Sequence, residues 1–115
     1  MVKTPSTIVL HGLPTCDACR TARAVLREAG RNVILRDLRS QAPNKAEVAR
    51  WQAAFGSDLL NRRSTTWRRL PESDRAGDPV ALMVVHPTLI KRPLIESDEG
   101  MHLGWTDATR AAFGL

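Results

Sequence analysis

Residues 13–23 read LPTCDACRTAR, and they place Cys16 and Cys19 at the start of a helical pattern with two residues between them. Before them, Thr7–Leu10 is a short apolar run with β-branched residues, which predicts a buried strand. After them, apolar positions recur at helical spacing to about Ala29, and Gly30 ends the pattern. With Val33–Leu38 as a second strand, the chain begins strand, helix, strand, and the connection is long enough for parallel pairing.

The remainder of the chain reads as helices followed by a hairpin. Asn44 and Glu47 form a capping-box pattern that opens a helix to Phe55. Asp78–Pro79 resembles an N-cap followed by proline, so a short helix is expected to about Val85. The other expected elements are a short helix leading into a loop over Leu59–Trp67, a strand over Thr88–Ile95 interrupted by Pro93, a strand over Met101–Trp105 paired with it around Asp98–Gly100, and a last helix capped by Thr106 or Asp107. This order predicts an α/β layered domain with a mixed sheet.

Length, composition and charge narrow the class of protein. A chain of 115 residues with 43% hydrophobic and 25% charged residues fits one globular domain, and we expect a monomer. No apolar run could span a bilayer and the N-terminus is too weakly apolar for a signal peptide, so we expect a cytoplasmic protein. The net charge of +5 is spread along the chain and aromatic residues make up only 4%, which favours a small anionic substrate over a nucleic acid.

The two cysteines are predicted to have unequal environments. Cys16 falls at a helix N-terminus, where unpaired N–H groups and the helix dipole favour a thiolate and lower its pKa. Arg20, one turn further, adds positive charge. Cys19 falls on the apolar stripe of the same helix. We therefore expect Cys16 to be exposed and nucleophilic, whereas Cys19 is either a buried resolving thiol or a small core residue.

A metal site is not expected. Zinc needs about four ligands, and the histidines that could complete a set with the cysteines are His11, His86 and His102. None of them has ligand spacing, so we expect surface or capping roles for all three.

Three segments in order carry a resemblance to a known family. They are IVLHGLPTCDACRTARAVLREAG (residues 8–30), LLNRRSTTWRRL (59–70) and HPTLIKRPLIESDEGMHLGW (86–105). Together they resemble the ArsC/Spx family of thioredoxin-like proteins, and its YffB-type branch in particular. The resemblance implies a thioredoxin-like fold with a mixed sheet and a helical insertion at about residues 40–85. It also implies that Cys16 is the active residue.

The resemblance further implies a thiol-dependent reductase that acts on arsenate or on a glutathione mixed disulfide. Glutathione would be the co-substrate, glutaredoxin or thioredoxin a possible protein partner, and no cofactor would stay bound. By position, Arg63 and Arg92 match arginines that hold the anionic substrate, a task suited to guanidinium groups. The supporting residues are expected to be Thr15, Arg20, Thr65 and Pro87.

Two departures weaken the arsenate assignment. Arsenate reductases of this family carry a third arginine that residues 99–106 lack, and a histidine where this chain has Gly12. A less charged pocket would suit a glutathione substrate. The Cys16–Cys19 spacing also matches Spx-type regulators, so the alternative is a redox-switched protein that binds RNA polymerase without turnover.

The resemblance also bears on one peptide bond. Because thioredoxin-like folds commonly have a cis proline near the active cysteine, we expect a cis His86–Pro87 bond.

Overall fold

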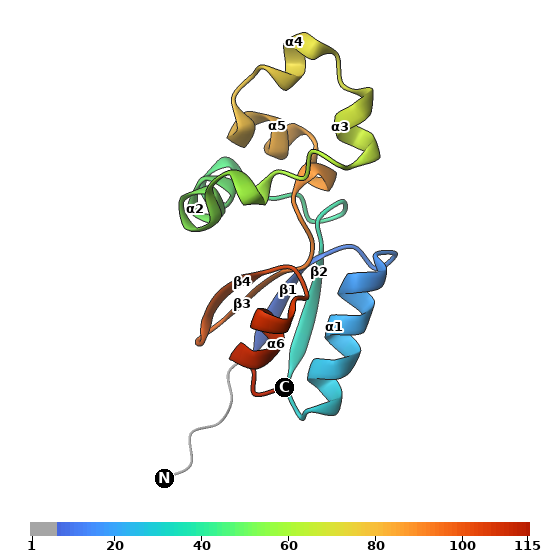
Figure 1. The fold of residues 1–115 in the computed structure, drawn as a ribbon, viewed down its shortest axis with the longest axis vertical. Helices are drawn as coiled ribbons and strands as arrows, with labels where there is room; N and C mark the ends of the chain where they lie inside the picture. The colour runs from blue at the N-terminus through green and yellow to red at the C-terminus, as the bar shows by residue number, and fades with distance from the viewer. Residues whose placement is uncertain (1–6) are drawn as a thin grey trace. The chain divides into compact units, whose positions relative to one another are not determined.

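A computed structural model describes residues 7–115, which form two compact units (Figure 1). The first unit combines the N-terminal residues as far as Asp37 with Arg92–Leu115, and the second is Leu38–Lys91. Within residues 7–115 no helix is long and apolar enough to cross a membrane.

The first unit is a mixed four-stranded sheet with helices. Its elements are β1 (Ile8–Gly12), α1 (Asp17–Glu28), β2 (Val33–Asp37), β3 (Leu94–Ser97), β4 (Gly100–Leu103) and α6 (Asp107–Ala112). The strand order is β2-β1-β3-β4, with β1 parallel to β2 and antiparallel to β3. The predicted opening of strand, helix and parallel strand is confirmed, as is the hairpin between β3 and β4. This is the α/β class expected from the sequence.

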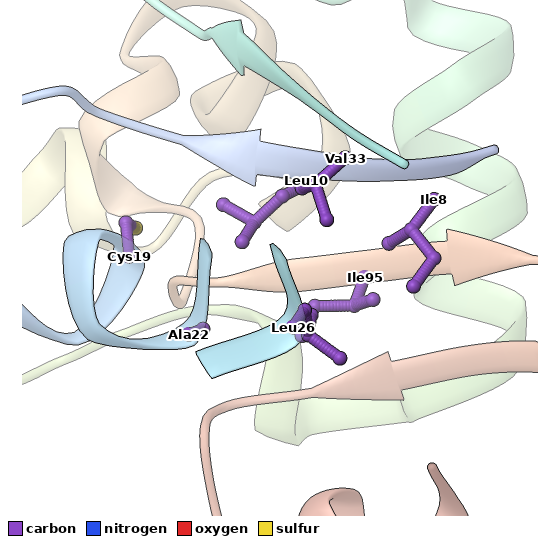
Figure 2. Packing of buried hydrophobic residues seen from close by; sticks show 7 residues of the cluster. All are labelled: Ile8, Leu10, Cys19, Ala22, Leu26, Val33 and Ile95. Atoms are coloured by element: carbon purple, nitrogen blue, oxygen red, sulfur yellow. The ribbon is translucent and has the colours of Figure 1, made fainter. Parts of the chain in front are cut away.

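The core of this unit lies between one face of the sheet and α1. Alternate strand residues Ile8 and Leu10 meet Cys19 and Leu26 of the helix, as Figure 2 shows. All four are fully buried. Burying a side chain of leucine size contributes about 1.5–3 kcal/mol, so the helix that starts at Cys16 is held firmly against the sheet.

The second unit is helical. Its elements are α2 (Lys45–Phe55), η1 (Gly56–Leu59), α3 (Thr65–Arg69), α4 (Glu72–Arg75), α5 (Pro79–Val85) and η2 (Pro87–Leu89). The predicted capping box is present: the Asn44 side chain accepts from the Glu47 N–H at 2.8 Å, and the Glu47 carboxylate accepts from the Asn44 N–H. Asp78 caps α5 by accepting from the Ala81 N–H, with Pro79 at the first helical position. Trp51 is fully buried in this unit.

Some predicted elements were wrong. The strand expected over Thr88–Ile95 is replaced by the η2 turn, an isolated bridge between Leu60 and Ile90, and a β3 strand that begins only at Leu94. The short helix expected over Leu59–Trp67 does not form as one element. The η1 turn ends at Leu59, where that helix was expected to begin, and the next helix, α3, starts only at Thr65. The short helix α4 was not predicted.

The proline expectation was also wrong. Among the described residues the cis peptide bond lies at Arg92–Pro93, not at His86–Pro87. Pro87 instead opens the η2 turn, where its fixed φ and missing N–H suit the first position of a helical turn.

Candidate functional site

Cys16 lies where the loop after β1 becomes the first turn of α1. It is the N-cap residue of α1, with extended dihedrals (φ −82°, ψ 122°), and its N–H donates to the Leu13 carbonyl at 3.1 Å. Its side chain is half-buried, rather than exposed as expected. The first N–H groups of a helix have no partner within the helix, so the sulfur sits where a negative charge is stabilised.

The surroundings of the Cys16 sulfur favour its thiolate. Burial by itself raises the pKa of Cys16, but hydrogen bonds from the Cys19 N–H, the Cys19 thiol and the Arg92 guanidinium outweigh it. The positive charge of Arg92 acts in the same direction, so the pKa of Cys16 lies below its ordinary value. Arg20 is not among the groups that produce this shift. The positive charge that stabilises the Cys16 thiolate therefore comes from Arg92, two residues before β3, and not from Arg20.

Cys19 has the opposite environment. It is fully buried, as its place on the apolar stripe predicted. Burial raises the pKa of the Cys19 thiol to about 12, against a hydrogen bond from the Leu13 backbone, and the neighbouring Cys16 sulfur adds to the rise. At neutral pH Cys19 is therefore a protonated thiol that donates to a Cys16 thiolate. Neither sulfur is in a disulfide.

Gly12 makes room for the Cys19 sulfur. A Cβ built at Gly12 would overlap the Cys19 Sγ and would lie 3.3 Å from the Cys19 Cβ and 3.4 Å from Leu10 Cδ2. In the sequence, Gly12 is only a departure from the arsenate reductase pattern. The structure gives it a physical reason, because any side chain at position 12 competes with the buried thiol for the same space.

Gly12→Ala is expected to lower the free energy of unfolding by about 1–3 kcal/mol, as overpacking in a core does. The added methyl must displace the Cys19 sulfur, so the pKa of Cys16 should rise as well. Urea unfolding and the pH dependence of Cys16 alkylation measure the two effects.

The matched control is the double variant Gly12→Ala/Cys19→Ala. Removing the sulfur relieves the overlap, so the two substitutions should be strongly non-additive in stability. Additive losses would show that the methyl clashes with something other than Cys19.

The other predicted site residues are divided between the two units. In the first, Thr15 lies exposed in the turn before Cys16, and Arg20 lies exposed on α1. In the second, Thr65 is the first residue of α3 and Pro87 the first of η2. Arg63 is exposed, and its N–H donates to the Asn61 side chain at 3.0 Å.

Arg63 lies within a basic cavity of the second unit. The cavity holds about 400 Å³ and is lined by Arg62, Arg63, Lys91, Asn61, Leu60, Asp58 and Ser57. The bridge between Leu60 and Ile90 supports it, with the Asn61 N–H donating to the Leu89 carbonyl and the Lys91 N–H to the Leu59 carbonyl, both at 2.8 Å. Guanidinium and ammonium groups of this kind suit a carboxylate or an oxyanion.

His11 corrects one prediction about the histidines. It is buried rather than on the surface, and its Nε2 lies 3.0 Å from a Glu96 oxygen on the neighbouring strand β3. His86 caps the end of α5, in agreement with the capping role expected for it. Within residues 7–115 no group of three or more histidine, cysteine or acidic side chains is arranged to hold a metal ion.

Comparison with known proteins adds a family to this geometry. The sequence model described as the ArsC family matches residues 11–113. An uncharacterized protein of Haemophilus influenzae is 31% identical over 112 residues, covering 92% of this chain and 98% of the relative. The global transcriptional regulator Spx of Bacillus subtilis is 26% identical over 106 residues, covering 87% of this chain and 81% of its own.

Solved structures share the fold. The YFFB protein superimposes with a TM-score of 0.81 at 33% identity, covering 91% of this chain and 97% of its own. An arsenate reductase from Vibrio cholerae superimposes with a TM-score of 0.74 at 20% identity, covering 87% and 91%. At that identity the second match supports the fold alone.

Proposed function

This chain belongs to the ArsC family, and from that premise we propose that it is a glutathione-dependent thiol reductase with Cys16 as its nucleophile. The observation that carries the proposal is the sulfur of Cys16 at the start of α1, held by the Cys19 N–H and the Arg92 guanidinium with its pKa below the ordinary value. The thiolate is the reactive form of cysteine, so this environment raises the reactive fraction at neutral pH.

The proposed substrate is a glutathione mixed disulfide. The Cys16 thiolate attacks the glutathione sulfur, the substrate thiolate leaves, and a Cys16–glutathione disulfide forms. A second glutathione thiolate then attacks that adduct, which releases oxidised glutathione and restores the Cys16 thiolate. Arg92, beside the Cys16 sulfur, binds a glutathione carboxylate. Arg63, in the basic cavity of the second unit, is proposed to bind a carboxylate or an oxyanion. Arsenate is the second substrate to test, with glutaredoxin or thioredoxin as alternative reductants.

The test is the alkylation rate of Cys16 against pH in the Cys19→Ser protein, with and without arsenate. A midpoint well below about 8.5, the value of a free thiol, is expected. Protection by arsenate would place an oxyanion beside Cys16 and select arsenate over the mixed disulfide. A midpoint at or above 8.5 would contradict the reductase, because the thiol would then be unactivated.

Cys19→Ser is expected to reduce turnover with glutathione by only a few-fold. With its pKa raised to about 12, the Cys19 thiol is a poor attacking group at neutral pH, so glutathione rather than Cys19 resolves the adduct. Steady-state rates with glutathione in excess measure this. A loss as large as that of Cys16→Ser would make Cys19 the resolving thiol.

A redox-switched regulator is the second candidate function. The observation that favours it is the likeness to the regulator Spx together with two free cysteines that have two residues between them. A pull-down with the C-terminal domain of the RNA polymerase α subunit separates the two functions. Binding by the oxidised protein alone would favour the switch, and no binding in either redox state would favour the enzyme.

A further inference from the structure

A stripe of arginines on α1 begins at the nucleophile. Arg20, Arg23 and Arg27 follow Cys16 at intervals of four, three and four residues, the spacing that places side chains in line along one face of a helix. Cys19 and Leu26, by contrast, face the core. The stripe therefore runs along α1 from the end of the helix at which Cys16 is the N-cap residue.

The arginine stripe borders an open groove, and its positive charges are not neutralised by carboxylates of the described residues. The groove holds about 720 Å³ and is lined by Asp17, Arg20, Thr21, Arg23, Ala24 and Arg27. Within residues 7–115, none of the three guanidinium groups forms an ion pair with a carboxylate. The Arg27 guanidinium donates to the Val33 carbonyl at 3.4 Å, a bond to the first residue of β2 that leaves its charge unneutralised. An anionic partner would thus meet three cations without displacing carboxylates of this chain.

We propose that this arginine stripe binds an acidic polypeptide segment that carries the glutathionylated cysteine, so that the physiological substrate is a glutathionylated protein. The inference rests on the proposed function, since it requires Cys16 to accept glutathione from a mixed disulfide. The covalent step is the one given above: the Cys16 thiolate takes the glutathionyl group and the cysteine of the acidic protein leaves as its thiolate.

The length of the stripe favours a polypeptide over a small disulfide. Cys16 and Arg27 are eleven residues apart, or about 16 Å along a helix at 1.5 Å per residue. An extended segment of about five residues spans that distance. A small mixed disulfide bound at Cys16 would leave the far end of the stripe empty, whereas acidic residues beside a modified cysteine reach all three arginines.

The chemistry of the surface also argues against a nucleic acid. The helix DACRTARAVLRE contains no aromatic residue on which a base could stack, and stacking on aromatic side chains supports the binding of single strands. Asp17 adds a carboxylate at the Cys16 end of the groove, which would repel a continuous row of phosphates. Separate acidic side chains can avoid it.

The experiment uses three synthetic peptides, each with one glutathionylated cysteine at its centre. In the first peptide three glutamates stand on each side of that cysteine, in the second three serines, and in the third three lysines. We expect kcat/KM for the glutamate peptide to exceed that for the serine peptide by about tenfold at low salt. The lysine peptide should be the poorest substrate. The preference should shrink at 0.15 M salt, where the Debye length is about 8 Å.

The variant Arg20→Gln/Arg23→Gln/Arg27→Gln should lose the ratio between the glutamate and serine peptides, which normalises for any general change in activity. Glutamine keeps helix propensity close to that of arginine. The matched control, Arg68→Gln/Arg69→Gln/Arg75→Gln, removes the same charge from exposed positions of the second unit and should retain the ratio. The single variant Arg23→Gln should lose part of it, so the test does not depend on the triple variant alone.

Three results would overturn the inference. One is a wild-type protein that turns over all three peptides equally, which leaves the proposed reductase standing but removes the docking surface. Another is an equal loss of the ratio in both triple variants, which would assign it to net charge. The third is stronger competition by a single-stranded oligonucleotide than by a glutamate peptide without the disulfide. No turnover of any peptide would overturn the reductase as well.

Discussion

Cys16→Ser is expected to reduce turnover of a glutathione mixed disulfide by at least about a thousandfold, since removing the nucleophile of a well-studied hydrolase costs about a millionfold. A serine hydroxyl does not ionise near neutral pH and cannot form the glutathione adduct. The same loss is expected with arsenate if that is the substrate. Initial rates with excess glutathione measure it, and mass spectrometry shows whether residue 16 gains glutathione.

The fold should survive this substitution, which makes the prediction sharp. Cys16 is the N-cap of α1, and serine is among the preferred residues at that position. The helix should therefore be unchanged or slightly more stable, and thermal unfolding provides the control. A folded Cys16→Ser protein with full turnover would remove Cys16 from the mechanism and leave the regulator as the better function.

Local side-chain chemistry made some elements predictable. Asn44 with Glu47, and Asp78 with Pro79, define helix starts within four residues of sequence, and both starts occur where expected. The apolar run around Leu89 and Ile90 misled because a short buried apolar run is compatible with a strand or a helical turn. In the fold both residues are buried, but Leu89 belongs to a 3-10 turn and Ile90 forms a single bridge with Leu60.

The parts of the candidate site that could be predicted are those set by the local sequence of elements along the chain. Placing Cys16 at a helix start required only the strand, loop and helix around it. Arg92 lies far from Cys16 in sequence, and only the family resemblance linked the two before the structure placed its guanidinium on the Cys16 sulfur. The role of Gly12 depends on how closely α1 packs on β1. A glycine in a strand does indicate close approach of another group, but it does not say which group.

Arg92→Met is expected to raise the pKa of Cys16 and to slow its alkylation at pH 7 by about tenfold. The substitution removes a hydrogen bond and a positive charge that favour the thiolate, and a hydrogen bond to a charged group contributes about 1.5–3 kcal/mol. Because Arg92 is partly exposed, the lower end of that range applies. The slower alkylation should appear at pH values below the Cys16 pKa of the variant. Above that pKa the slowing should vanish, because Cys16 is then ionised in both proteins.

The high-pH limb distinguishes this mechanism from general damage to the site. A thiolate of higher pKa is the better nucleophile once it is ionised, so the Arg92→Met protein should react slightly faster than wild type above about pH 10. Lys91→Met removes the same charge from the neighbouring, exposed position, which is not among the groups that shift the pKa of Cys16. It should leave the alkylation curve in place. Equal shifts in both variants would mean that net charge, rather than the guanidinium on the sulfur, prepares Cys16 for attack.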